Sequence, residues 1–87
     1  MSEVDWMGIK LFHKTQRDLA VSINSVIDQY WDDKIDELEM IKTIQNLHEV
    51  NQSKMVKDGR YTTIISQQCG KKRLEVVDQV INKFEID

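Results

Sequence analysis

The sequence predicts an all-α fold, built as a single small bundle of three to four helices. Three observations indicate this class. The chain has 87 residues, enough for one domain with one core. It contains no proline and only three glycines, so few residues interrupt a helix. Apolar residues recur at helical spacing over most of the chain from residue 15 onward.

Residues 1–14 precede the first expected helix and carry too many apolar side chains for a free tail. Ile9 and Leu11 alternate with Lys10, which is typical of a short strand. The simpler interpretation is an extended arm that Trp6 and Phe12 pack onto the core. The sequence therefore predicts either a short strand or an arm in this segment.

The first helix is expected over residues 15–31. Thr15 is a good N-cap, and Asp18 falls near the positive end of the helix dipole. An apolar stripe with the 3.6-residue helical period follows, made of Leu19, Ile23, Val26, Ile27, Tyr30 and Trp31. The aromatic pair that ends this stripe is expected to anchor the core.

A second helix is expected over residues 33–54, with Asp32 or Asp33 as its N-cap. One side of this helix gathers the apolar residues Met40, Ile41, Ile44, Leu47 and Met55. His48 and Asn51 lie on the same side, and the helix is expected to fray between Asn51 and Met55.

The third quarter of the chain contains a turn signal, Lys57-Asp58-Gly59. A short helix over 60–69 and a last helix over 71–84 are expected after it. In one straight helix, the apolar groups before and after Gly70 would point roughly 130° apart, so we expect a bend or turn at Gly70. The alternative is a strand from Tyr61 to Ile65, where β-branched residues are frequent.

Charge reverses sign along the chain, whose total is −3. Residues 53–73 carry a net +5, whereas residues 1–52 carry −5 and residues 74–87 carry −3. An acidic chain that concentrates positive charge in one segment is expected to present that segment to an anionic partner, either a nucleic acid or an acidic protein surface. The residues predicted to contact this partner are Lys54, Lys57, Arg60, Gln67, Gln68, Lys71, Lys72 and Arg73.

The sequence around Gly70 partly resembles a helix-turn-helix. Four positions fit that pattern, namely Ile65, Ser66, Cys69 and Val76, whereas Lys71 and Gln79 stand where apolar residues are usual. The resemblance implies that Lys71, Lys72 and Arg73 bind phosphate at the start of the last helix. Gln67 and Gln68 are then placed to donate to phosphates or to read base edges.

The competing interpretation of the basic segment is a solvated surface. Its cations would then pair with the acids of the first half of the chain, Asp32, Asp33, Asp36 and Glu37.

No catalytic, cofactor or metal site is predicted, and we expect a binding protein rather than an enzyme. His13, His48 and Cys69 lack the close paired spacing of a zinc site. We expect a loop position for His13, a core-edge position for His48 and burial for Cys69. A single cysteine, no signal peptide and no apolar stretch of about 20 residues favour the cytoplasm without membrane contact.

Four stretches resemble a family of small uncharacterised proteins from low-GC Gram-positive bacteria and their mobile elements. They are residues 10–17 (KLFHKTQR), 28–31 (DQYW), 57–59 (KDG) and 70–77 (GKKRLEVV). The resemblance spans most of the chain and brings no activity with it. It implies a compact cytoplasmic protein, consistent with carriage on a phage or a plasmid.

The sequence is also compatible with two alternative functions. The chain can act as a protein-binding inhibitor or adaptor, if Leu74 and Val77, with Tyr61 or Trp6, form an exposed apolar patch with a basic rim. It can also work as a homodimer that shares the apolar residues of its last helix, Val77, Val80, Ile81 and Phe84.

Overall fold

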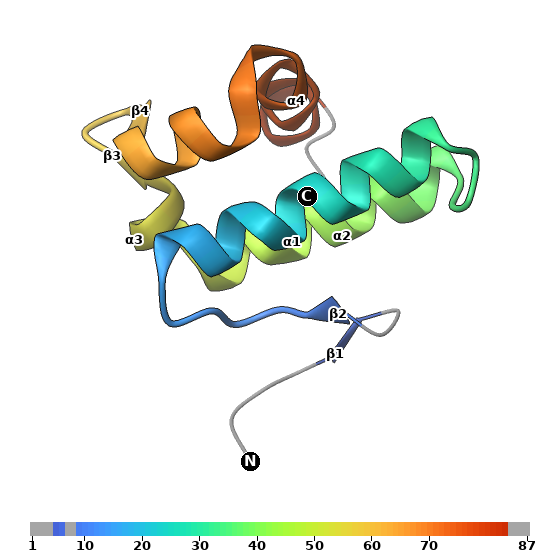
Figure 1. The fold of residues 1–87 in the computed structure, drawn as a ribbon, viewed down its shortest axis with the longest axis horizontal. Coiled ribbons are helices and arrows are strands. Elements are labelled where there is room, and N and C mark those ends of the chain that lie inside the picture. Colours follow the sequence, from blue (N-terminus) through green and yellow to red (C-terminus); the bar gives the residue numbers. More distant parts are fainter. Residues whose placement is uncertain (1–4, 7–8, 84–87) are drawn as a thin grey trace.

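A computed structural model describes residues 5–6 and 9–83 of the chain. These residues form a small helical bundle, as the sequence predicts (Figure 1). The helices are α1 (Gln16–Trp31), α2 (Glu37–Val50), α3 (Gln52–Met55) and α4 (Thr63–Lys83). Two antiparallel strand pairs join β1 (Asp5–Trp6) to β2 (Ile9–Lys10), and β3 (Val56–Lys57) to β4 (Arg60–Tyr61).

Helix α1 begins where the capping signal predicts. The Thr15 hydroxyl accepts a hydrogen bond from the backbone N–H of Asp18 at 3.0 Å. The first four turns bury the expected apolar stripe, including Leu19, Ile23 and Ile27. The expectation that Trp31 anchors the core is wrong, because its side chain is 47 % exposed. Trp31 is the last residue of the helix, so its side chain lies at the edge of the core.

Helix α2 begins at Glu37, four residues later than expected. Asp33 adopts a left-handed backbone conformation with φ of 62°, which no helical residue has. The N-cap is Asp36, whose carboxylate accepts from the N–H of Glu39 at 2.8 Å, while the Glu39 carboxylate accepts from the N–H of Asp36 at 3.2 Å. This capping box selects the start of the helix.

Asn51 separates α2 from α3, so the expected helix over 33–54 is two helices. Its buried side-chain amide donates to the carbonyl oxygens of Leu11 and Leu47, at 2.6 and 2.9 Å. Its side-chain oxygen accepts from the backbone N–H of His13 at 3.1 Å. Asn51 therefore fixes residues 11–13 against the helices, whereas Trp6 and Phe12 were the expected anchors. Phe12 is half-buried, and the side chain of Trp6 lies outside the described part of the chain.

The turn at Lys57-Asp58-Gly59 is confirmed, and it closes a β-hairpin that replaces the expected start of a helix at residue 60. Asp58 and Gly59 have φ of 55° and 79°, as a two-residue type I′ turn requires. Lys57 pairs with Arg60, and Val56 pairs with Tyr61. Of the alternative strand from Tyr61 to Ile65, only Tyr61 lies in a strand, because α4 begins at Thr63.

The predicted bend at Gly70 is confirmed. Its φ of 80° and ψ of 169° divide α4 into a first half (63–69) and a second half (71–83). Figure 1 shows the first half from the side and the second half end-on. Because of the bend, both halves bury apolar residues in one core, Ile65 and Cys69 from the first half and Val77 and Val80 from the second.

The burial of the second half corrects two expectations. Val77 and Val80 are 0 % and 1 % exposed within a single chain, so neither is free to form a dimer interface, and Val77 is not part of an exposed patch. Phe84, the other large residue of the expected interface, lies outside the described residues. Within the described residues, no helix has the length and apolar character to span a membrane.

Candidate anion-binding surface

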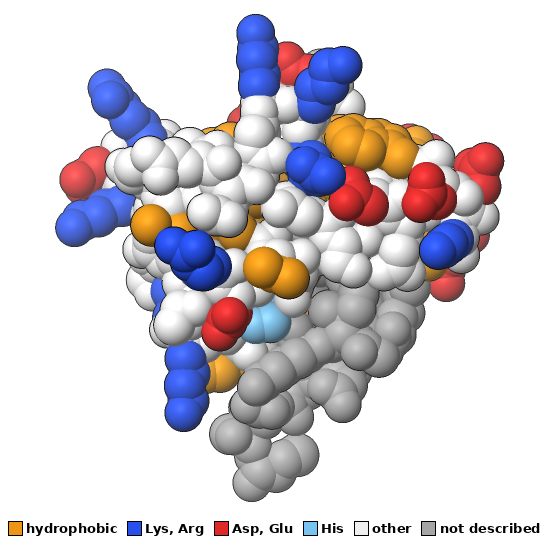
Figure 2. Space-filling model, viewed as in Figure 1, with side chains coloured by type: hydrophobic (Ala, Val, Ile, Leu, Met, Phe, Trp, Pro, Cys, Tyr) orange, Lys and Arg blue, Asp and Glu red, His pale blue; other side chains and the backbone are white. Residues whose placement is uncertain are grey.

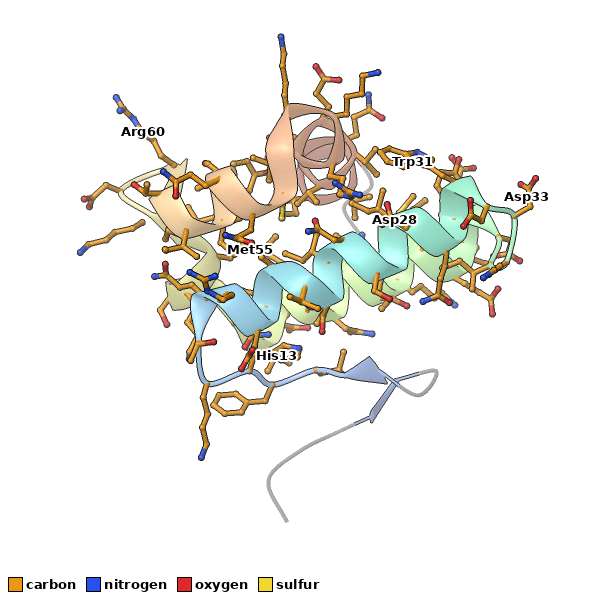
Figure 3. All side chains as sticks on the ribbon, viewed as in Figure 1. His13, Asp28, Trp31, Asp33, Met55 and Arg60 are labelled. Carbon is orange, nitrogen blue, oxygen red and sulfur yellow. The ribbon has the colours of Figure 1, made fainter. Side chains whose placement is uncertain are left out.

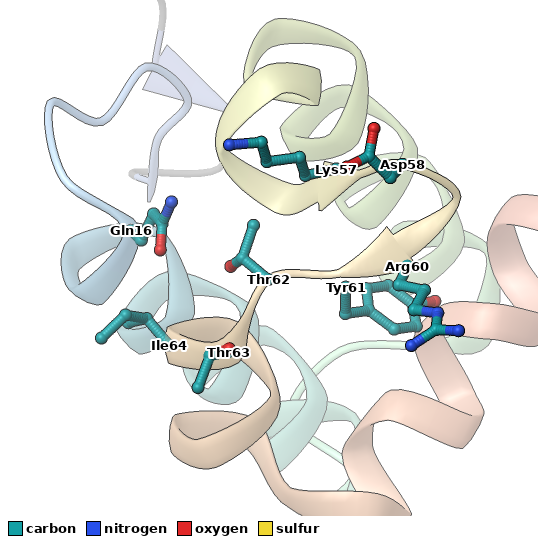
Figure 4. Close-up of a pocket in the computed structure, with 8 residues that line it drawn as sticks. All are labelled: Gln16, Lys57, Asp58, Arg60, Tyr61, Thr62, Thr63 and Ile64. Atoms are coloured by element: carbon teal, nitrogen blue, oxygen red, sulfur yellow. The ribbon is translucent and has the colours of Figure 1, made fainter.

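The β3–β4 hairpin carries two of the predicted cations, Lys57 and Arg60. They are exposed and stand opposite each other in the strand register. Like charges directly opposite disfavour a strand pair. Figure 4 shows the two side chains extending from the hairpin in different directions, which reduces this repulsion.

An open hollow of about 600 Å³ lies beside this hairpin (Figure 4). Gln16, the first residue of α1, and Thr63, the first residue of α4, both line it, so two helix N-termini meet there. The Thr62 hydroxyl caps α4 by accepting from the N–H of Ile65 at 3.3 Å. No acid occupies the first turn of α4, so the partial positive charge of that helix end stays uncompensated by its own side chains. Asp58 also lines the hollow and is the one carboxylate there among the described residues.

The bend of α4 carries a second pair of cations, Lys71 and Lys72. Both side chains are exposed at the first turn of the second half, where their charge adds to the positive end of the helix dipole. Gln67 and Gln68 are also exposed, just before the bend. The backbone carbonyl of Gln68 accepts a hydrogen bond from the side-chain amide of Asn24 at 3.0 Å, which joins α1 to α4.

Arg73 differs from the other cations because its charge is compensated. Its guanidinium donates to both carboxylate oxygens of Asp28 in α1, over distances of 2.9 to 3.1 Å. It also donates to the carbonyl oxygen of Cys69 at 3.3 Å and lies 5.8 Å from the ring centre of Trp31. Figure 3 shows Asp28 and Trp31 in the C-terminal part of α1. The acid that pairs with it is therefore Asp28, which the solvated-surface interpretation did not name.

Lys54 is also engaged within the fold. Its ammonium lies 5.0 Å from the ring centre of Phe12, in the arm. Lys54 and Arg73 thus hold elements together. In the described part of the chain, none of Lys57, Arg60, Lys71 and Lys72 forms an ion pair or a side-chain hydrogen bond. These four residues are the exposed cation set.

The exposed cation set divides between the two ends of the first half of α4. Seven helical residues separate the hairpin pair from the bend pair, a rise of about 10 Å. Figure 2 shows basic side chains projecting from the hairpin and α4, whereas acidic side chains gather around the turn between α1 and α2. The basic surface ends one turn past Lys72, where Glu75 and Asp78 are exposed.

The helix-turn-helix pattern fits the structure only in part. Ile65 and Cys69 are buried, as that pattern requires. Ser66 is exposed in the inner angle of the bend, and Val77 rather than Val76 points fully into the core. The two helical halves meet at one residue, whereas a helix-turn-helix uses a turn of three to four.

The three candidate ligands His13, His48 and Cys69 do not converge. Among the described residues, no group of three or more His, Cys, Asp or Glu side chains is placed to hold a metal ion. His13 lies outside the helices and strands, as expected, but it is buried, and its Nε2 lies 2.9 Å from the Ser22 hydroxyl. Half-burial lowers the pKa of His48, which Glu49 partly offsets, and burial raises the pKa of the Cys69 thiol to about 11.

Sequence reasoning missed the hairpin and the hollow next to it. An Asp-Gly pair between extended residues is a strong hairpin signal, and it was available in residues 56–61. No sequence pattern predicts that Gln16 lines the hollow, because its position there depends on how α1 packs against α4.

A family model described as a conserved hypothetical protein matches residues 10–82. The chain belongs to this family. The match covers both the hairpin and the bend of α4, which carry the exposed cation set. No curated protein and no solved structure matches the chain.

Proposed function

We propose that this protein is a small, non-enzymatic nucleic-acid-binding protein that contacts phosphates through its exposed cation set. One observation carries the proposal. Four of the six cations in residues 53–73 remain exposed and without a carboxylate partner in the described structure, although the chain as a whole is acidic. Exposed Lys and Arg side chains supply most of the non-specific affinity for nucleic acid.

The proposed contact has two parts. Lys57 and Arg60, beside the N-terminus of α4 at the hollow, favour one pair of phosphates, one for each cation. Lys71 and Lys72 favour another, about 10 Å away along the first half of α4. Measured along the axis of duplex DNA, which rises about 3.4 Å per base pair, this separation spans about three base pairs. Gln67 and Gln68 lie between the two parts and can donate to phosphates or base edges.

The proposal includes where the protein works. We place the protein in the cytoplasm of low-GC Gram-positive bacteria, encoded by the host or by a mobile element. It binds through a helix-turn-helix-like element, of which the first turn of the second half of α4 contacts the nucleic acid. Glu75 and Asp78 limit the contact to that turn, because carboxylates repel phosphate.

The proposal predicts a steep salt dependence of binding. Four neutralised phosphates give a log–log slope of the association constant against salt of about −3.6 on duplex DNA. Fluorescence anisotropy of a labelled duplex, titrated at several salt concentrations, measures this slope. The double variant K71A/K72A is expected to reduce its magnitude by about 1.8 and to weaken binding to all sequences equally.

The matched control is the double variant K34A/K42A, which removes two exposed lysines elsewhere on the chain. It changes the net charge by the same amount and is expected to alter the slope much less. Equal effects of the two double variants would show that net charge alone matters, and the absence of binding at low salt would reject the proposal.

A further inference from the structure

An apolar groove lies in the inner angle of the bent helix α4. It measures about 450 Å³. The first half of α4 runs between the hairpin and the second half of α4 (Figure 1), and each of these three parts supplies a wall. Its lining residues are Tyr61, Ser66, Lys71, Leu74, Glu75 and Asp78. The apolar surface comes from Tyr61 and Leu74, which are half-buried and pack against the core from outside.

The second half of α4 presents one helical face to this groove. Lys71, Leu74, Glu75 and Asp78 follow the spacing i, i+3, i+4 and i+7, which places them on one side of a helix. The core takes a different face, that of Val77 and Val80. The groove therefore has an ordered pattern of charge, with one cation near the bend, an apolar middle and two carboxylates beyond it.

Asp78 is held in place at the far end of the groove. Its Oδ1 accepts from the side-chain amide of Asn82 at 2.8 Å and from the Tyr61 hydroxyl at 3.5 Å. Its Oδ2 has no hydrogen bond within the described residues. An oriented carboxylate with one free oxygen, one turn from Glu75, suits a lysine or arginine side chain.

We propose that this groove binds a peptide segment of a partner protein, with an aliphatic side chain between Tyr61 and Leu74 and a basic side chain on Glu75 and Asp78. The apolar floor favours an aliphatic anchor, as in helix-in-groove recognition. The two carboxylates repel phosphate, so the same groove disfavours nucleic acid. This surface lies beyond the proposed nucleic-acid contact and shares only Lys71 with it.

Two synthetic amphipathic helical peptides provide the probes. They have leucines at the same positions, and one carries lysines where the other carries glutamates. Nuclear magnetic resonance titration of the whole ¹⁵N-labelled protein is expected to show at least tenfold tighter binding of the leucine–lysine peptide. The shifted amides are expected to cluster at Tyr61, Ser66, Leu74 and Asp78.

Charge exchange in the groove is expected to reverse this preference. The double variant E75K/D78K should bind the leucine–glutamate peptide at least tenfold better than the leucine–lysine peptide. The control D32K/E49K changes net charge equally at exposed positions outside the groove, and it should keep the wild-type preference. If E75K/D78K does not fold, the titration of the wild-type protein still decides the proposal.

Three results would overturn it. Equal binding of both peptides to the wild-type protein would show that the carboxylates do not select the partner. Shifts that cluster around Trp31 instead of the groove would place the contact on another surface. The same groove shifts appearing when protein concentration alone is raised would identify a second copy of the chain as the occupant.

Discussion

The two halves of α4 meet at Gly70 but are held to the bundle by different means. The first half starts from a hydroxyl cap on Thr62 and buries Ile65 and Cys69. The second half buries Val77 and Val80, and the ion pair of Arg73 with Asp28 joins its first turn to α1. The first turn of the second half therefore contains Arg73, whose charge is paired within the fold, and the two exposed cations Lys71 and Lys72. Neighbouring positions in one basic run thus have separate structural and surface roles.

The strongest destabilisation is expected from a substitution at the bend. Gly70 has a φ of 80° with an extended ψ of 169°, a region essentially restricted to glycine, although a methyl group there would meet no atom within 4 Å. G70A is therefore expected to cost about 1–3 kcal/mol through backbone strain rather than collision. Urea unfolding measures this cost.

Gly59 provides the matched control for the bend. It also has a positive φ, 79°, and open space around its Cβ position, but it lies in the exposed hairpin turn. G59A is expected to cost about 1 kcal/mol, as for an ordinary left-handed residue. A larger cost for G59A than for G70A would contradict the view that the bend is the more constrained position.

The next largest effect comes from breaking the ion pair that joins the second half of α4 to α1. A double-mutant cycle of D28N and R73M is expected to give a coupling energy of about 1 kcal/mol. This coupling energy is smaller than the 3–5 kcal/mol typical of breaking a fully buried ion pair, because the side chains of Asp28 and Arg73 are 46 % and 31 % exposed. Unfolding of the two single variants and the double variant measures the coupling.

The same cycle separates the structural cation from the exposed ones. R73M is expected to change the salt slope of DNA binding by much less than K71A does, since the charge of Arg73 is already neutralised by Asp28. Equal changes in slope would mean that Arg73 leaves Asp28 to contact phosphate.

The smallest effect is a pH dependence at the end of the first half. Burial raises the pKa of Cys69 to about 11 from its ordinary value of 9. The unfolded chain therefore loses this proton first, and the contribution of Cys69 to stability is full below pH 9 and decreases as pH rises toward 11. The difference in unfolding free energy between the wild type and C69A should shrink over this window, while a constant difference would contradict a raised pKa.

The secondary structure followed from the sequence where local signals are strong. The cap at Thr15 and the stripe from Leu19 to Ile27 predicted α1, and the diverging apolar faces predicted the bend at Gly70. The start of α2 was predicted four residues early because three aspartates can serve as caps, and only the geometry of Asp33 and Asp36 distinguishes them. Asn51 gave no signal of its role, because its partners lie up to 40 residues away.

Sequence patterns were sufficient to predict a helical bundle with a bend in its last helix and a basic segment in an acidic chain. Those features are predictable because apolar periodicity, helix caps and segment charge can each be read from neighbouring residues in the sequence. Which cations stay exposed depends instead on how the helices pack. The attraction between two charges weakens quickly with distance, so an ion pair needs close contact. Asp28 and Arg73 are 45 residues apart in the sequence and come into contact only when α4 packs against α1.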